Sequence, residues 1–152
     1  NTFIGNDAGM NATTATKNTA VGSNALSTAT TTTASDSNTA VGYFTLNAAI
    51  GGYANTAVGD RAGTAVSGGD YNTLLGFTAG ANITTGSGNV IIGDIDADAV
   101  DSARTLKIAG NDGSTLTTWI TGDSSGNVIH AGTTHAAGGQ LTTTGKSLVM
   151  GF

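Results

Sequence analysis

Pairs of apolar residues recur through the first 93 residues of the chain, each pair between an asparagine-led dipeptide and a glycine. The pentapeptide NTAVG occurs three times, and three close variants extend the series to six copies, at residues 1–5, 18–22, 38–42, 55–59, 72–76 and 89–93. Valine, isoleucine and threonine favour strands, whereas glycine and asparagine favour turns. Each copy therefore predicts a short β-strand that ends at a glycine turn, and the predicted fold class is all-β.

The copies repeat at an interval of 17 residues, interrupted once by an interval of 20. The unit reads N-T-x-φ-G-x-x-A-[LG], where φ is apolar, followed by about eight linking residues rich in threonine, alanine, glycine and asparagine. Such a unit is too short for a helical hairpin or a propeller blade. It predicts one coil of a β-solenoid, with two short strands and two turns, and about 4.8 Å between coils. The three extra residues fall within 27–37 and predict a longer surface loop.

Stacking identical units places identical residues in columns along the solenoid axis. The asparagines would form a ladder of side-chain amides, similar in kind to those of cross-β structures. The glycines would supply positive φ angles at a corner of each coil. The predicted structural repeat positions are Asn1, Asn18, Asn38, Asn55, Asn72 and Asn89 for the first column, and Gly5, Gly22, Gly42, Gly59, Gly76 and Gly93 for the second.

Two further columns are both apolar, at the third and the fourth residue of the unit. Neighbouring residues of a strand point to opposite faces, so both faces of the predicted strand are apolar. One face can fill the thin interior of the coil, and the other needs a cover. Because the sequence predicts no helices, another copy of the same chain is the natural cover. The pattern therefore predicts a homo-oligomer.

The unit resembles a known family of head repeats, and NTAVGSNAL at residues 18–26 is its closest copy. It is similar to the heads of trimeric autotransporter adhesins of the YadA type, and to arrays in predicted tail-fibre proteins of bacteriophages. The resemblance covers about residues 1–97 and implies a left-handed parallel β-roll of about six 17-residue coils, with three chains around one axis. The longer period and the threonine at the second position depart from the adhesins. The asparagine-led form, with GKSLVMGF ending the chain, resembles phage fibres more.

Residues 98–152 lack the repeat and predict a small β-rich tip, a meander that follows the repeat domain of residues 1–97. The dipeptide Asp-Gly at 112–113 is a hairpin signal, and residues 122–127 read as a turn. The strand candidates are the segment around Leu106 and Ile108, LTTWIT at 116–121, NVIHA at 127–131 and KSLVMGF at 146–152. The candidate receptor-binding residues of the two connections are Asn111, Asp112, Asp123, Ser124, Ser125 and Asn127.

The amino-acid composition and net charge limit the classes of partner that the chain can bind. The chain has 24 glycines and 28 threonines but no proline, cysteine or glutamate, and its net charge is −5. Because the chain has no basic patch, we expect no nucleic-acid partner. No apolar run is long enough for a membrane helix, so we expect no membrane insertion. The chain begins on the first letter of a repeat, so we expect further fibre or tail protein upstream.

An acidic segment, 94–101, holds four of the ten aspartates, Asp94, Asp96, Asp98 and Asp101. Its favoured interpretation is a segment that closes the last coil and protects its open edge. A glycan-cleaving carboxylate pair on one strand face and a calcium site are the alternatives. His130 and His135 would meet a metal only around a threefold axis, and we expect them to be structural. The sequence thus predicts no catalytic residue, no cofactor and no metal site.

Aromatic residues are few. Trp119 is the only tryptophan, and it would either stack on a sugar or, in the favoured interpretation, pack in the core between three chains. The others lie in turns and linkers near the repeated strand, where packing between neighbouring coils is favoured over contact with a receptor glycan. They are Tyr43, Phe44, Tyr53, Tyr71 and Phe77.

These features favour a non-enzymatic function: the distal, adhesive part of a homotrimeric bacteriophage tail fibre. Such a protein is extracellular, belongs to the virion, and binds a host cell-surface glycan or outer-membrane receptor. The alternative is the head of a bacterial trimeric autotransporter adhesin. A tailspike glycan hydrolase and an ice-binding solenoid are less favoured, the latter suggested by the threonine ladder Thr2, Thr19, Thr39, Thr56 and Thr73.

Overall fold

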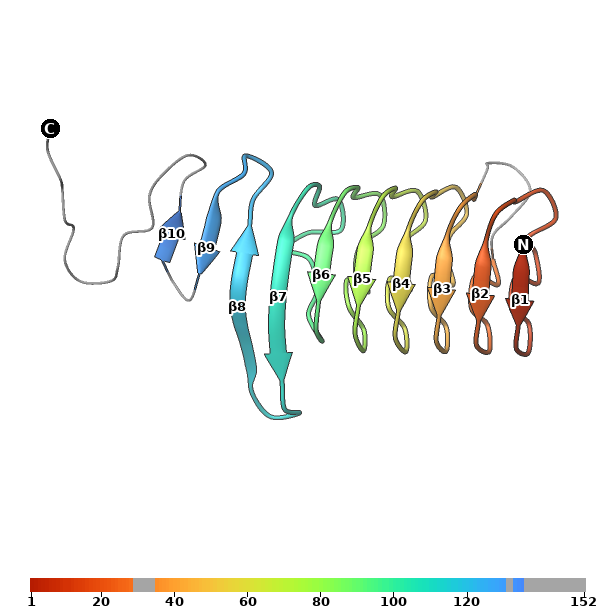
Figure 1. The fold of residues 1–152 in the computed structure, drawn as a ribbon, viewed down its shortest axis with the longest axis horizontal. Helices are drawn as coiled ribbons and strands as arrows, with labels where there is room; N and C mark the ends of the chain where they lie inside the picture. Colours follow the sequence, from red (N-terminus) through yellow and green to blue (C-terminus); the bar gives the residue numbers. More distant parts are fainter. Residues whose placement is uncertain (29–34, 131–132, 136–152) are drawn as a thin grey trace, which may run out of the picture.

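The computed structural model describes residues 1–28, 35–130 and 133–135 (Figure 1). In this part of the chain every regular element is a β-strand, so the predicted all-β class is confirmed. Ten strands of the described residues form one sheet, and their spatial order is their order along the chain. No helix in the described part is long and apolar enough to cross a membrane.

Six short parallel strands, one from each repeat copy, form the first part of the sheet. Each is hydrogen-bonded in register with the next, threonine opposite threonine or its equivalent. The predicted β-solenoid of about six coils is therefore confirmed. The strands are β1 (Thr2–Ile4), β2 (Thr19–Val21), β3 (Thr39–Val41), β4 (Thr56–Val58), β5 (Thr73–Leu75) and β6 (Val90–Ile92).

The C-terminal strands continue the same sheet. Strand β7 (Leu106–Asn111) pairs in parallel with β6, and β8 (Leu116–Gly122) returns antiparallel to it. Strands β9 (Val128–His130) and β10 (Thr133–His135) complete an antiparallel meander. The predicted hairpin at Asp-Gly and the predicted turn at 122–127 are both present, whereas the strand expected at 146–152 lies outside the described residues.

The second strand expected in each coil is wrong for the described linking segments, which form turns. Each segment begins with a tight turn, as where the Val66 N–H donates to the Gly63 carbonyl oxygen, and the first five segments end on a left-handed residue, such as Lys17 and Tyr71, with φ of 60° and 56°. A turn at one end and a left-handed residue at the other bend the backbone away from an extended strand. The turns still stack, because backbone N–H groups donate across coils, as from Leu46 to Ala62 and from Gly63 to Ala79.

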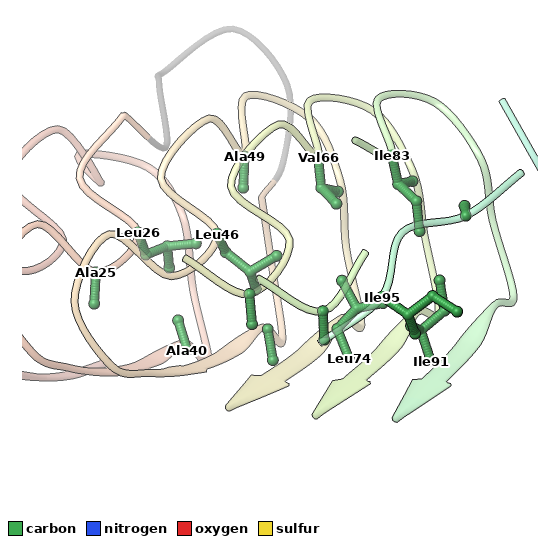
Figure 2. Close-up of a cluster of buried hydrophobic side chains, with 14 of the residues drawn as sticks. Ala25, Leu26, Ala40, Leu46, Ala49, Val66, Leu74, Ile83, Ile91 and Ile95 are labelled. Atoms are coloured by element: carbon green, nitrogen blue, oxygen red, sulfur yellow. The ribbon is translucent and has the colours of Figure 1, made fainter. Parts of the chain in front are cut away.

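The third position of the unit fills the interior (Figure 2). From Ala20 onward this column is fully buried, and side chains from the turns meet it. In the second and third coils the strand supplies a small residue, as Ala40, and the turn supplies a large one, as Leu46. Where the strand supplies Leu74, the turns supply glycines, and a Cβ on Gly63 would lie 2.6 Å from a Leu74 methyl group. The alternation of leucine and glycine at the ninth position is thus a packing complement to the strand.

The fourth position faces outward. Ile4 is 59% exposed and Leu75 is 47% exposed, and the residues between them in this column are half-buried. The threonines of the second position lie on the same outward face, since two residues along a strand return to one side. The coil therefore has an aliphatic interior and an outer face with parallel threonine and aliphatic columns.

The column of buried third-position side chains ends at a charged residue, Lys107. Lys107 pairs with Ile91 and so occupies the next interior position after it. Its ammonium group donates to the Asp96 carbonyl oxygen and to the Asp98 carboxylate, and only 12% of the side chain is exposed. The aliphatic stem covers the last apolar layer while the charged end reaches polar partners at the edge.

Candidate functional site

The asparagine column forms the predicted ladder. From Asn18 to Asn89 these side chains are at most 1% exposed. Each Oδ1 accepts the backbone N–H of the equivalent residue in the next coil, at 2.7–3.1 Å. Each Nδ2 donates to a carbonyl oxygen of a linking segment, at 2.6–2.9 Å. The amide thus joins the strand to the linker, a role that the ladder alone does not predict.

The glycine column has positive φ at every copy, from 111° at Gly93 to 140° at Gly59, as predicted. The structure adds a second reason for glycine. A Cβ on Gly59 would lie 2.6 Å from the carbonyl carbon of Gly76 in the next coil, and the other five columnar glycines face a backbone carbonyl in the same way. The position therefore needs both a left-handed φ and no side chain.

The candidate receptor-binding residues fall into two groups at opposite ends of β8 (Figure 1). Asn111 and Asp112 lie at the β7–β8 connection, whereas residues 123–127 form the β8–β9 turn. All six are at the surface, and Asn127 is the least exposed of them. The structure does not bring the six residues together, so they form two separate sites.

Both aspartates of these connections hold their own loops. Asp112 Oδ1 accepts the backbone N–H groups of Ser114 and Thr115, at 2.9 and 2.8 Å. The Asp123 carboxylate accepts the Asn127 side-chain amide and the backbone N–H groups of Ser125 and Asn127. Because these donors favour the charged form, the pKa of each carboxyl is lowered.

We expect the two carboxyls to titrate below the ordinary pKa of aspartate, 3.8. A lowered pKa in the folded state means that each carboxylate stabilises its loop above the ordinary pKa, and that this contribution is lost as the pH falls through the lowered one. Carboxyl ¹³C chemical shifts measured from pH 7 to pH 2 check this, with Asp112→Asn and Asp123→Asn for assignment. The amide shifts of Ser114 and Thr115 should move at the Asp112 midpoint. A midpoint at or above 3.8 would contradict the loop geometry.

A pocket of about 440 Å³ lies at the β7–β8 hairpin, around Trp119. The tryptophan is 52% exposed. Its six-membered ring lies over Gly110, where a Cβ would approach the ring to 2.6 Å. The pocket is lined by Gly110, Asn111, Asp112, Thr115, Thr117 and Trp119. Within one chain, the tryptophan is therefore exposed beside two of the candidate receptor-binding residues.

A second pocket, of about 250 Å³, lies against the β8–β9 turn. Aliphatic side chains of Val90, Leu106 and Val128 line it together with polar groups of Arg104, Asp123 and Asn127. Sequence reasoning found the turn but not this pocket, because the pocket forms only where β6, β7 and the turn meet.

The acidic segment does not form a strand, so the alternative in which Asp94, Asp96 and Asp98 share one strand face is wrong. The carboxylates bond to different partners instead. Asp94 accepts from the Thr78 hydroxyl and the Asn111 amide, Asp96 accepts the backbone N–H of Asn82, and Asp98 pairs with Lys107. These bonds tie the segment to the preceding coil and to β7, in agreement with a closing role. Among the described residues, no group of three or more His, Cys, Asp or Glu side chains could hold a metal ion.

The remaining aromatic residues partly follow the expected packing between coils. Tyr53 and Tyr71 of successive coils meet edge-to-face at 4.9 Å, and their hydrogen bond raises the pKa of Tyr53. Arg61 lies 5.4 Å from the ring centre of Tyr43 in the preceding coil, and Tyr43 also packs on its neighbour Phe44. Phe77 is 54% exposed. His130 is exposed on β9, and the backbone of His135 pairs with Val128 at the other end of that hairpin.

Comparison of the chain with protein-family models, with curated protein sequences and with solved structures finds no match. The described part of the molecule is a stack of coils whose outer face carries an aliphatic column beside a threonine column, followed by a hairpin that carries an exposed tryptophan. Both features suit contact with other molecules.

Proposed function

We propose that this chain is the distal part of a homotrimeric bacteriophage tail fibre, which attaches the virion to its host. Its partners are two further copies of itself, upstream fibre or tail proteins, and a host cell-surface glycan or outer-membrane receptor. The protein is extracellular, acts without catalysis, and has the left-handed roll that the YadA-like repeat implies. The repeat supplies a stiff support, and the strands after residue 97 supply the contact.

One observation carries the proposal: the outward aliphatic column. It runs in register through β1 to β6 and continues at Ile108 of β7. Its residues are half-buried or exposed in a single chain, up to 59% at Ile4. Soluble monomers rarely present a contiguous apolar strip of this kind, and such strips mark interfaces. A second and third copy fit the strip, because each carries the same column at the same spacing.

Leu75→Lys is expected to abolish trimer assembly at micromolar concentration while the free energy of unfolding of the single chain changes by within about 0.5 kcal/mol. The reason is that assembly would bury three lysines close together without partners. Light scattering measures the mass, and circular dichroism the fold. Thr85→Lys is the matched control, since Thr85 is exposed in a linking segment away from the strip. A wild-type chain that is a folded 14.8 kDa monomer at these concentrations would contradict the proposal.

Host attachment needs a separate experiment. The trimeric protein, added to candidate host cells before the phage, is expected to reduce phage adsorption, and antibodies against it should label the fibres of the virion. Labelling of a bacterial surface instead would favour the adhesin alternative. No competition and no labelling on any host would overturn attachment while leaving the trimer intact.

Ice binding is a second candidate function, because the outward threonines form a regular column. Its members face outward and stack in register from β1 to β5. Only one threonine recurs per strand, and the parallel column is aliphatic, so the surface is less regular than one with two threonines per strand. Thermal hysteresis of the purified protein tests this candidate directly, and its absence excludes it.

A further inference from the structure

The pairing of β7 with β8 contains an irregularity at Trp119. Ile108 pairs with Ile120, but the next residue, Ala109, pairs with Thr118. Trp119 is therefore an extra residue, a β-bulge. Bulges redirect a side chain out of the regular alternation of a strand, and they are over-represented next to functional sites. Here the bulge accompanies a ring that lies over Gly110 and leaves the tryptophan 52% exposed.

Polar groups lie around this ring, and some of them have no hydrogen-bond partner in the described part of the chain. Both backbone bonds to Asp112 end on its Oδ1, so Oδ2 has no partner in the described part of the chain. The hydroxyl groups of Thr115 and Thr117 line the same pocket, and neither forms a side-chain hydrogen bond to any described residue. The Asn111 amide is fixed, because Nδ2 donates to Asp94 and Oδ1 accepts the N–H of Gly113. An exposed aromatic face thus lies beside fixed hydrogen-bonding groups, in a volume within the roughly 300–1,000 Å³ of small-molecule sites.

The surroundings distinguish this pocket from the outward aliphatic strip. The strip continues to Ile108, but the next outward position along β7 is Gly110, which pairs with Thr117. Beyond Ile108, β7 therefore continues the aliphatic column no further, and the Trp119 ring of β8 lies over Gly110 instead. Figure 1 also shows that the far half of the β7–β8 hairpin extends past the edge of the coils. Packing of coil against coil would leave this part of the hairpin uncovered.

We propose that this pocket binds one neutral pyranose residue of a glycan, with Trp119 stacked on the sugar ring and Asp112, Thr115 and Thr117 hydrogen-bonded to its hydroxyl groups. Pyranoses present an apolar C–H face for the ring and hydroxyl groups at the edge for the polar side chains. The ionised Asp112 accepts hydrogen bonds from hydroxyl groups and repels a carboxylate, so sugar acids bind less well. The inference deepens the proposed attachment and rests on it for the source of the glycan.

The intact trimer allows a direct test, because Trp119 is the only tryptophan and its fluorescence reports this pocket alone. The probes are methyl glucoside, methyl galactoside and N-acetylglucosamine, with glucuronate as the anionic counterpart of glucose. We expect a saturable change of emission with at least one neutral probe, and affinity about tenfold lower for the matching acid, equivalent to 1.4 kcal/mol. Asp112→Asn should remove most of that discrimination.

Ligand-observed NMR extends the test to variants without the fluorophore. Trp119→Ala is expected to weaken binding by about thirtyfold or more, the loss typical of an aromatic hot spot. Phe77→Ala is the control, since Phe77 is similarly exposed but lies on a coil outside the pocket. The proposal is overturned if no neutral probe binds up to its solubility limit. It is also overturned if acrylamide fails to quench Trp119 in the free trimer, because another chain then covers the ring.

These outcomes separate the pocket from the wider function. If the protein competes with phage adsorption but binds none of the neutral sugars, the pocket assignment is wrong and attachment uses another surface. If a neutral sugar binds and the Trp119→Ala variant no longer binds it, the proposed sugar site is supported even where the protein attaches to no host cell.

Discussion

Replacing Gly59 by alanine is expected to lower the free energy of unfolding by about 4 kcal/mol or more, with full loss of the fold as the extreme result. Two costs combine at this site. Alanine rarely adopts a φ of 140°, and its Cβ would press on the carbonyl group of Gly76, with the carbonyl carbon at 2.6 Å. Neither backbone can retreat, because coils on both sides are hydrogen-bonded to them. Urea unfolding followed by circular dichroism measures the change.

Substitutions at two other glycines distinguish the cost of the unfavourable φ from the cost of the contact between coils. Gly113 has a φ of 90°, and a Cβ added there would have no neighbouring atom within 4 Å, so Gly113→Ala should cost only the left-handed backbone term, about 1–2 kcal/mol. Gly68 has neither a left-handed φ nor a close neighbour, and Gly68→Ala should change stability by within about 0.5 kcal/mol. Equal effects at Gly59 and Gly113 would show that the contact between coils contributes nothing.

Replacing Asn55 by alanine is expected to cost about 3 kcal/mol or more, because several buried groups lose partners together. Asn55 is fully buried, and its Nδ2 donates to Gly69 at 2.8 Å. Its Oδ1 accepts both the backbone N–H and the side-chain amide of Asn72, each at 3.0 Å. Alanine leaves the Gly69 carbonyl oxygen and the Asn72 backbone N–H without these partners, while the Asn72 side-chain amide keeps only its bond to Gly86. Asn1→Ala, at the exposed end of the same column, should cost much less, since water can replace the amide there.

The substitution Asn55→Asp tests the hydrogen bonds without opening a cavity. A carboxylate at this position would face the Gly69 carbonyl oxygen and is buried, so its pKa should be raised. A group whose pKa is raised by folding stabilises the fold at low pH and loses that contribution as the pH rises through the raised value. The variant should therefore gain stability on acidification, as its protonated carboxyl can donate to Gly69. A variant as stable as the wild type at pH 7 would contradict the ladder.

Much of the solenoid could be predicted because the same residue types recur at the same interval in six successive units. A constant interval with constant residue types allows few arrangements other than in-register stacking, so the coil number and the asparagine and glycine columns followed from spacing. The linking segments were mispredicted for an equally local reason. Their threonines and alanines suggested a strand, but at the last position of these segments residues as different as Lys17, Ala54 and Tyr71 adopt the same left-handed conformation. Stacking on the neighbouring coils imposes that conformation against their individual preferences.

In the hairpin region, the sequence predicted the strands and turns but not which side chains lie close together in space. Turn residues located the two connections, yet the separation of Asp112 from Asp123 depends on the length of β8 between them. The prominence of Trp119 depends on a shift of register that leaves no sign in the sequence. The partners of Asp94, Asp96 and Asp98 likewise come from an earlier coil and from β7, which sequence distance conceals.

The sequence by itself determined the coil and its stacking, because a periodic chain satisfies its backbone hydrogen bonds most simply by laying each unit on the one before. Only the tertiary structure decided which apolar column faces inward. Alanines at the third position leave room for leucines from the turns, and the larger aliphatic residues at the fourth position remain outside, where Leu75 is 47% exposed. That choice depends on the volume available between strand and turn. Side chains from several coils set this volume, so the sequence of one repeat unit does not reveal it.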